Sequence, residues 1–148
     1  MEAILFTGIQ ATGKSTFYKR YFADTHIRIN LDMLKTRHRE DILLTACIKA
    51  KQRFVVDNTN PTVETRQKYI ALAQEADEFK IIGYYFQSKL NDAIKRNNTR
   101  AGKACIPEKG IRAAYAKLEI PSLSEGFDTL YYVTINSDNT FTIKEWAK

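Results

Sequence analysis

Cysteine is scarce in this sequence of 148 residues, and long apolar runs are absent from it. Its two cysteines, Cys47 and Cys105, lie far apart without any paired Cys/His spacing, which argues against a disulfide framework and against a zinc site. Reduced cysteines are typical of the cell interior, so we expect a cytoplasmic location. No apolar run approaches the roughly 20 residues of a membrane-spanning helix. The opening residues MEAILFT also lack the basic region of a signal peptide, so neither a membrane protein nor a secreted one is expected.

The sequence also lacks internal repeats, low-complexity tracts and blocks of five like charges. Its length allows one domain with a substantial core and is too short for two, so we predict a single domain over residues 1–148. Lysine and arginine outnumber the acidic residues and give a formal net charge of +6. This excess is either a solubilising surface or a surface that attracts a polyanionic acceptor, and composition alone leaves both interpretations open.

The segment GIQATGKST at residues 8–16 matches G-x-x-x-x-G-K-[ST], the pattern of a phosphate-binding loop. The apolar run AILFT before it reads as a strand buried on both faces, and KSTFYKRYFA after it has aromatic residues at helical spacing. Such a loop binds phosphate oxygens through its backbone amides and the helix N-terminus. We predict a nucleoside triphosphate site, in which Lys14 contacts the β- and γ-phosphates and the Ser15 hydroxyl binds Mg²⁺. The residues of this segment predicted to bind ATP are Gly8, Gln10, Ala11, Thr12, Gly13, Lys14, Ser15 and Thr16.

Five apolar segments read as strands, and helical patterns lie between them. The strands are expected at residues 3–7, 28–30, 53–57, 79–86 and 129–135. Apolar residues at helical spacing occupy 43–50, 90–94 and 107–118, and a further helix is expected to open with Asn60 as its cap and Pro61 as its first residue. This alternation predicts an α/β protein with the P-loop kinase fold, a three-layer α/β/α arrangement around a parallel core sheet. The segment 136–148 has no assigned place, and a short strand is one option.

Polar residues directly after strands are the candidates for function, because ligands of parallel α/β sheets bind at the carboxyl ends of the strands. Asp32 follows the second strand and is either an acid in the first turn of a helix or the base that accepts a proton from an attacking hydroxyl. Asp57 ends the third strand and is either a turn residue or the Walker B acid that holds Mg²⁺, directly or through water. Lys35 begins a basic edge that is either solvated or meets an acceptor phosphate.

The basic segment KRNNTRAGKACIP at residues 95–107 follows the helix after the fourth strand. Its small and polar residues and the irregular run before Pro107 predict a flexible basic lid over about 96–107 that covers the phosphates. Arg96 and Arg100 in this lid are either charges near a helix C-terminus or clamps on the β- and γ-phosphates, where charge develops during transfer. Lys95 and Lys103 add to the positive charge of the same segment.

Taken in order, these segments resemble the 5′-kinase domain of the polynucleotide kinases of phage and animal end-healing systems. INLDML is similar to the family's segment with the general base, VVDNTNP to its second acidic segment, KRNNTRAGKACIP to its arginine-bearing lid, and IPSLSEGF to the end of its kinase domain. The resemblance implies ATP as donor, Mg²⁺ as cofactor and a 5′-hydroxyl end of RNA or DNA as acceptor. It implies that Lys14, Asp32 and Arg100 are catalytic, that Arg96 and Arg100 bind the phosphates of ATP, and that Asp32, Lys35 and Asp57 face the acceptor.

The sequence departs from the family's pattern in two residues and one segment. Leu31 and Lys35 stand where family members often carry arginine, and lysine offers a point charge in place of a bidentate fork. The D-x-D-x-T segment of the family's phosphatase domain is absent, so the resemblance implies that a phosphatase and a ligase are separate proteins. A phage-encoded protein in host cytosol would fit the same resemblance. Two rival functions stay open: a small-molecule or nucleotide kinase of the same fold, and a nucleotide-binding switch that transfers nothing.

Overall fold

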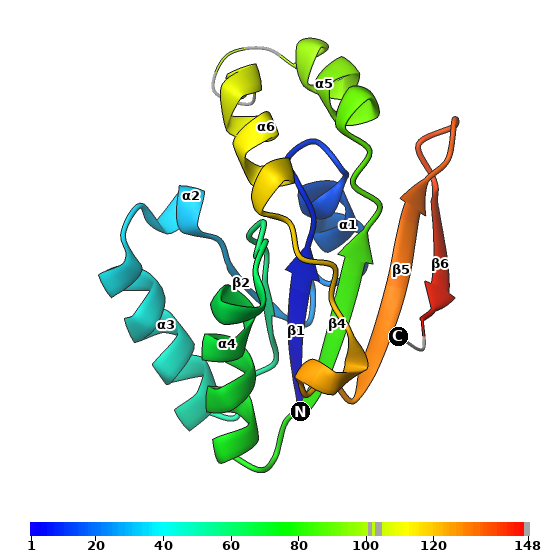
Figure 1. Ribbon diagram of the computed structural model, residues 1–148. Helices are drawn as coiled ribbons and strands as arrows, with labels where there is room; N and C mark the ends of the chain where they lie inside the picture. The colour runs from blue at the N-terminus through cyan, green and yellow to red at the C-terminus, as the bar shows by residue number, and fades with distance from the viewer. Residues whose placement is uncertain (101, 103–104, 147–148) are drawn as a thin grey trace.

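A single sheet of six strands is the centre of the computed structural model, which describes residues 1–100, 102 and 105–146 (Figure 1). The order of the strands is β2-β3-β1-β4-β5-β6, so the first strand of the chain lies in the interior of the sheet. The first five strands are parallel, and β6 pairs antiparallel with β5 at the sheet edge. The strands are β1 (Glu2–Thr7), β2 (Ile27–Ile29), β3 (Phe54–Val56), β4 (Lys80–Phe86), β5 (Thr129–Ile135) and β6 (Phe141–Glu145).

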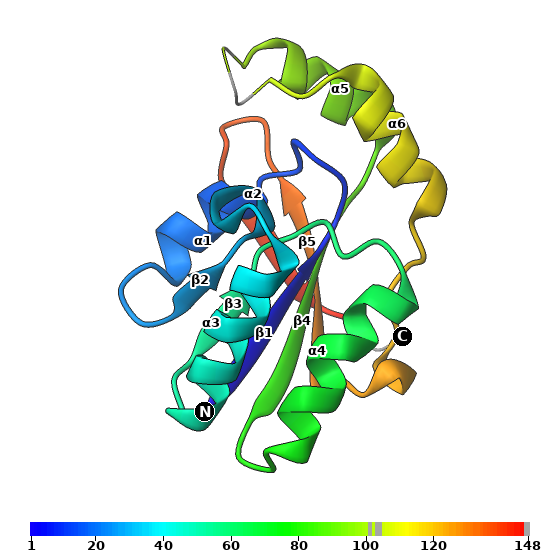
Figure 2. The ribbon, with the colours of Figure 1, turned by 90° about the vertical axis from the view of Figure 1, so that its left-hand side faces the viewer.

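Helices lie on both faces of this sheet (Figure 2). One face carries α3 (Arg37–Lys49), α4 (Val63–Glu75) and the short 3-10 helix η2 (Leu123–Glu125), and the other face carries α1 (Lys14–Tyr21). Beyond the carboxyl ends of the strands lie α2 (Leu31–Leu34), α5 (Leu90–Asn98) and α6 (Glu108–Lys117), the last two packed against each other. The predicted P-loop kinase fold, with three layers and a parallel core sheet, is confirmed.

The alternation of side chains along β1 produces two apolar cores, one on each face of the sheet. Ala3 and Leu5 belong to the core beneath α3 and α4. Ile4 and Phe6 belong to the core beneath α1, where the rings of Phe6 and Phe17 meet edge to face with 5.8 Å between their centroids. Because β1 is buried on both sides, the loop that leaves its carboxyl end starts from a fixed position.

The start of α4 differs from the prediction made from the sequence. Thr62, not Asn60, caps this helix, and it forms a capping box with Thr65, so Pro61 lies outside the helix. The reason is the backbone of Asn60, whose φ of 44° is left-handed, while its buried amide donates a hydrogen bond to the Phe6 carbonyl at 2.8 Å. Asn60 therefore ties the end of β3 to β1 instead of starting a helix.

The last segment of the chain forms a hairpin with β5. Asn136 and Thr140 close the turn by a backbone hydrogen bond of 2.8 Å, and β6 runs back along β5 from Phe141. The short strand left as an option for 136–148 is therefore present, and residues 147–148 lie outside the described part. Over the described ranges, no helix combines the length and the apolar character needed to cross a membrane.

Candidate active site

The phosphate loop connects β1 to α1 and depends on the small size of Gly13. This residue has a φ of 95°, in the left-handed region that favours glycine. A Cβ atom here would lie 2.8 Å from Ile135 Cδ1 and 2.9 Å from Phe141 Cε1, closer than such atoms can approach. The β5–β6 hairpin thus lies directly against the loop, and a larger residue at position 13 would strain the backbone and require Ile135 and Phe141 to shift.

Lys14 is the first residue of α1 and its ammonium group is buried beneath the loop. Nζ donates hydrogen bonds to the carbonyl oxygens of Gly8 at 2.8 Å and Ile9 at 2.7 Å. The pKa of Lys14 is lowered to about 8, chiefly by burial; Asp57 and Asp32 oppose the shift, and nearby Arg100 contributes to it. A phosphate group bound at the loop would favour the charged ammonium again.

Ser15 and Asp57 bring two oxygen ligands together at the start of α1 and the end of β3. Ser15 Oγ lies 3.4 Å from Asp57 Oδ2. Arg28 of β2 reaches both groups: its Nε donates to Asp57 Oδ2 at 2.8 Å, and its Nη2 donates to Ser15 Oγ at 2.9 Å. Asp57 is only 2% exposed, so this ion pair compensates a carboxylate that solvent hardly reaches.

The chemistry of this pair of ligands fits Mg²⁺. The ion prefers hard oxygen ligands and usually takes one or two from the protein, with phosphate oxygens and water completing its shell. The hydroxyl of Ser15 and the carboxylate of Asp57 supply such oxygens beside the phosphate loop. The described residues contain no cluster of three or more His, Cys, Asp or Glu side chains that could hold a metal by themselves.

Asp32 is held at the site by the short helix α2. The side chain of Asn30 caps this helix by accepting a hydrogen bond from the Met33 amide at 2.9 Å, and its Nδ2 donates to the Asp57 carbonyl at 2.6 Å. The Leu31 amide donates to Asn58 Oδ1 at 2.8 Å. The contacts with Asp57 and Asn58 fix α2 to the end of β3, and the exposed carboxylate of Asp32 faces the cavity there.

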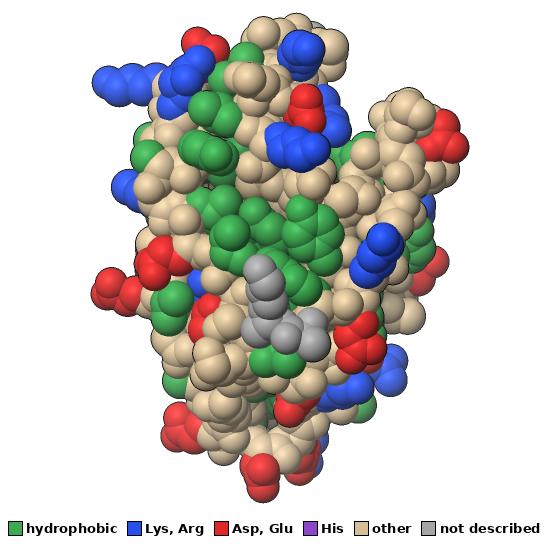
Figure 3. Space-filling view, turned by 45° about the vertical axis from the view of Figure 1, so that its right-hand side comes forward, with side chains coloured by type: hydrophobic (Ala, Val, Ile, Leu, Met, Phe, Trp, Pro, Cys, Tyr) green, Lys and Arg blue, Asp and Glu red, His purple; other side chains and the backbone are tan. Residues whose placement is uncertain are grey.

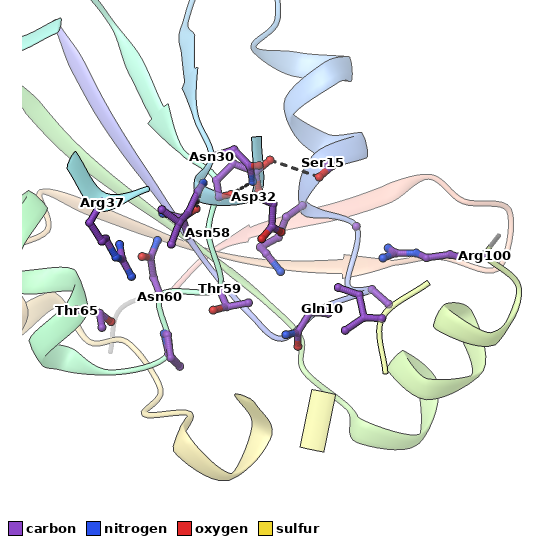
Figure 4. Close-up of a pocket in the computed structure, with 17 residues that line it drawn as sticks. Gln10, Ser15, Asn30, Asp32, Arg37, Asn58, Thr59, Asn60, Thr65 and Arg100 are labelled. Atoms are coloured by element: carbon purple, nitrogen blue, oxygen red, sulfur yellow. Dashed lines mark hydrogen bonds between the residues drawn. The ribbon is translucent and has the colours of Figure 1, made fainter. Parts of the chain in front are cut away.

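These groups line one cavity of about 280 Å³ at the carboxyl ends of the strands (Figure 4). Gln10 and Arg100 lie at one end of the cavity, Arg37 and Thr65 lie at the other, and Asp32 and Asn58 lie between them. One end of the cavity therefore lies at the phosphate loop and the lid. The other end lies beside the first turns of α3 and α4. Its lining residues are Gln10, Ala11, Gly13, Lys14, Ser15, Asn30, Leu31, Asp32, Arg37, Asp57, Asn58, Thr59, Asn60, Pro61, Thr65, Arg100 and Ile106.

The predicted lid comprises the end of α5 and the connection to α6. Asn97 fixes the connection, since its Nδ2 donates to the Ile106 carbonyl at 2.5 Å and its Oδ1 accepts from the Ile106 amide at 2.8 Å. Arg96 Nη1 reaches the Ala11 carbonyl of the phosphate loop at 3.5 Å. Lys103 lies outside the described residues, and the flexibility of the segment stays a prediction.

Most of the site residues expected from the sequence meet at this cavity, and the others lie around it. Lys14, Ser15, Asp32, Asp57 and Arg100 line it together with Gln10, Ala11 and Gly13. Among the described residues, Gly8, Thr12, Thr16, Lys35 and Arg96 do not line it. Lys35 is exposed at the C-terminal end of α2 with a φ of 77°, whereas Arg37, on the same basic edge, contributes to the lining.

Several side chains of the site were not singled out from the sequence. Arg28 pairs with Asp57, Asn30 positions α2, and Asn58 contacts Leu31 and the buried carboxylate of Glu40. A charged residue between two isoleucines in a short strand is the only signal in the sequence that could have pointed to Arg28. The contacts of Asn30 and Asn58 depend on the pairing of β2 with β3, which a local pattern does not reveal.

Comparison with known proteins gives the same fold and a consistent set of relatives. A protein of Schizosaccharomyces pombe named bifunctional polynucleotide phosphatase/kinase is 29% identical over 131 residues, covering 85% of this chain and 32% of the relative. An L-seryl-tRNA(Sec) kinase of Methanococcus maripaludis is 26% identical over 144 residues, covering 84% of this chain and 55% of the relative. The chain thus spans about a third to a half of these relatives.

A solved structure and a protein family complete the comparison. A chain in the structure of the Pnkp1/Rnl/Hen1 RNA repair complex is similar with a TM-score of 0.64 and 23% identity, covering 79% of this chain and 43% of that one. Residues 4–121, from β1 to just before η2, match the family described as an AAA domain. This chain belongs to the AAA domain family.

Proposed function

We propose that this chain is a kinase that uses ATP and Mg²⁺ to phosphorylate the 5′-hydroxyl end of RNA or DNA, as a step in nucleic-acid end healing. The observation that carries the proposal is the position of Asp32, which faces the same cavity as Lys14, Ser15, Asp57 and Arg100. A carboxylate beside a phosphate loop is unfavourable for binding a nucleotide alone, because like charges repel. A carboxylate that orients an acceptor hydroxyl and takes its proton explains this placement.

Each of these five residues that line the cavity has a part in the proposed reaction. Lys14 and Arg100 would hold the β- and γ-phosphates and stabilise the charge that develops during transfer. Ser15 and Asp57 would hold Mg²⁺, which when bound neutralises phosphate charge. Asp32 would orient the acceptor hydroxyl in line with the γ-phosphate and accept its proton late, since the transition state of phosphoryl transfer is loose.

A nucleic-acid acceptor is supported by charge and by one relative. Arg37 lies at the end of the cavity away from the phosphate loop, where it could meet a backbone phosphate of the acceptor. Figure 3 shows that Lys and Arg side chains predominate over acidic ones at the upper end of the molecule, where α5 and α6 lie, and that acidic side chains predominate toward the lower end. The Schizosaccharomyces pombe relative carries the name of a polynucleotide kinase.

A second candidate acceptor is a hydroxyl group of a small molecule, or one carried by a tRNA, in place of a nucleic-acid 5′-hydroxyl. The Methanococcus maripaludis relative is named a kinase of L-seryl-tRNA(Sec), so the hydroxyl of a serine attached to a tRNA is a relevant alternative. A nucleotide-binding switch is the third candidate, which would hydrolyse ATP slowly without an acceptor.

A single transfer assay distinguishes these functions. Label from γ-labelled ATP would be followed to 5′-hydroxyl RNA, 5′-hydroxyl DNA, a free nucleoside and seryl-tRNA, with and without Mg²⁺. We expect labelled 5′ ends on an oligonucleotide, loss of label in Lys14→Ala, and full transfer in Lys19→Ala, whose side chain is exposed on the same helix. Preferential labelling of the nucleoside or of seryl-tRNA would refute the polynucleotide acceptor, and ATP hydrolysis without any labelled acceptor would refute the kinase.

A further inference from the structure

Arg28 occupies a place in the site that the proposed reaction does not use. Its Nη2 lies 2.8 Å from Asp57 Oδ2 and 2.9 Å from Ser15 Oγ, and its Nε lies 2.8 Å from the same carboxylate oxygen. The guanidinium group thus contacts both oxygens assigned above to Mg²⁺. Its carbon Cζ also lies 5.7 Å from the ring centre of Tyr18, within the range of a cation–π contact.

A hydrogen-bond donor and a metal ion compete for these oxygens, because both need their lone pairs. The side chain of Arg28 is 23% exposed and that of Asp57 only 2%, so the pair lies largely out of solvent. Without a cation beside it, the Asp57 carboxylate would be buried and unpaired, which is strongly unfavourable. In the absence of metal, Arg28 supplies that cation.

We infer that Arg28 is a built-in substitute for the divalent cation: it holds Ser15 and Asp57 in place until Mg²⁺ displaces the guanidinium group from them. The inference rests on the proposed function only in assigning a metal–nucleotide complex to this site. Arg28 is then a positioning residue that sets how much Mg²⁺ the protein requires. Three cationic side chains, Lys14, Arg37 and Arg100, line the cavity beside this pair. A free divalent ion therefore meets strong repulsion in the wild type and is expected to enter together with the nucleotide phosphates.

Replacement of Arg28 should convert the site into one that binds free Mg²⁺. We expect Arg28→Gln to be less stable than wild type without Mg²⁺, because Asp57 loses its partner, and to regain stability as Mg²⁺ is added. The half-saturating Mg²⁺ concentration should fall at least about tenfold below that of wild type, since hydrogen bonds to charged groups typically contribute that much or more. The measurement is thermal unfolding against MgCl₂ without nucleotide, at ionic strength held constant with KCl.

Three further variants make the result specific. Arg53→Gln removes the same charge from an exposed residue just before β3, at the other end of that strand from Asp57, and should behave as wild type. The double variant Arg28→Gln/Asp57→Asn should lose the response to Mg²⁺, because the carboxylate that binds it is gone. If Arg28→Gln does not fold without metal, Arg28→Lys retains one positive charge without the fork and should show an intermediate Mg²⁺ requirement.

The outcomes separate this inference from the proposed function. Equal Mg²⁺ curves for wild type and Arg28→Gln would overturn the inference, even if the wild type phosphorylates 5′ ends. Weaker nucleotide binding by Arg28→Gln at saturating Mg²⁺ would also overturn it, because Arg28 would then be a phosphate ligand. A lowered Mg²⁺ requirement in Arg28→Gln would support it, whichever acceptor the wild type uses.

Discussion

Asp32 and Lys14 reach one cavity from two separate elements, α2 and α1, and their proposed roles can be separated by measurement. We expect Asp32→Asn to lower kcat by at least about a hundredfold, the usual scale for a general base, because an amide cannot accept the acceptor proton. Nucleotide affinity should be retained, since Asp32 is assigned to the acceptor. Steady-state kinetics and nucleotide binding measure the two effects, with the exposed Asp24→Asn as control. Weakened nucleotide binding with unchanged kcat would instead place Asp32 on the metal side.

Arg37 and Lys35 belong to the same basic edge but differ in position, since Arg37 lines the cavity and Lys35 does not. For a single strand, each contact with a phosphate contributes about −0.7 to the slope of log affinity against log salt concentration. If Arg37 makes one such contact, Arg37→Gln should make the slope shallower by nearly that amount. Lys35→Gln should reduce it less. The KM for a 5′-hydroxyl oligonucleotide would be measured at several salt concentrations. A larger effect of Lys35→Gln would return the acceptor contact to Lys35, as the sequence alone suggested.

The position of single residues at the cavity could be predicted where a sequence pattern fixes their place in the fold. Lys14 and Ser15 follow from the loop pattern, and Asp32 and Asp57 follow from the rule that ligands bind after strands. Arg28 could not be predicted, because its role arises from two contacts with side chains far away in the sequence. A charged side chain is informative only once its partners are known.

At the scale of elements, a buried carboxylate joins α3, α4 and the loop after β3. Glu40 is fully buried and accepts hydrogen bonds from Tyr69 at 2.8 Å, Asn58 at 3.0 Å and Arg37 at 3.0 Å. Burial alone would raise the pKa of Glu40, but these hydrogen bonds outweigh it, so the pKa lies below its ordinary value of 4.5. The folded protein is therefore stabilised by the ionised carboxylate.

The stability of the protein should depend on Glu40 in a specific pH range. Because the pKa is lowered on folding, its contribution is complete above the ordinary value of 4.5 and is lost as pH falls through the lower value of the folded state. We expect Glu40→Gln to lower the free energy of unfolding at pH 7 by about 2 kcal/mol, typical of hydrogen bonds to a charged group. Urea unfolding from pH 7 to pH 3 should show the difference from wild type shrinking below about pH 4.5. A difference that is constant with pH would show that the carboxylate charge is not involved.

The lid is the second element whose role can be tested. Arg100 lines the cavity, and its proximity contributes to the lowered pKa of Lys14. We expect Arg100→Ala to lower kcat by about a hundredfold or more and nucleotide affinity much less, because a clamp on developing charge acts mainly in the transition state. Arg100→Lys should recover only part of the rate, because it lacks the planar fork. Single-turnover rates and nucleotide binding measure the two effects, and full activity in either variant would remove Arg100 from the catalytic residues.

Elements were predicted well where one apolar pattern runs through them and less well where side chains set their ends. The strand at 129–135 was predicted with the bounds observed for β5. The predicted start of α4 was wrong by two residues, because the sequence Asn-Pro resembles a helix start whereas Asn60 makes a long-range contact with Phe6. The position of β6 could not be predicted, because its pairing with β5 depends on the arrangement of the whole sheet and not on a local sequence pattern.

At the scale of the whole molecule, the β5–β6 hairpin supports the phosphate loop from the side. Phe141 packs at right angles to Phe17 with 5.0 Å between ring centroids, and its ring closes the space beside Gly13. We expect Phe141→Ala to lower the free energy of unfolding by about 2 kcal/mol, below the usual range for a buried phenylalanine because the side chain is half-buried. Nucleotide affinity should fall as well, because the loop loses its support.

A control on the same strand separates loss of loop support from loss of stability. Ile143→Ala removes a more exposed side chain further along β6, so it should lower stability without changing nucleotide affinity. Urea unfolding and nucleotide titration of both variants make the comparison. Equal effects of Phe141→Ala and Ile143→Ala on affinity would show that the hairpin acts only through general stability.

The contact between the hairpin and Gly13 also has a consequence for synthesis of the protein. The phosphate loop leaves the ribosome early, directly after β1, but Ile135 and Phe141, which press on it, are translated more than a hundred residues later. Pairing between such distant segments forms late and slowly in folding, because a long intervening chain must first be ordered. A nascent chain that ends before β5 and β6 would therefore contain the complete loop motif without the side chains of Ile135 and Phe141 that pack beside Gly13. We expect ATP to be bound only after the hairpin has emerged from the ribosome, so that a ribosome-stalled fragment ending before β5 would neither bind nor consume the nucleotide.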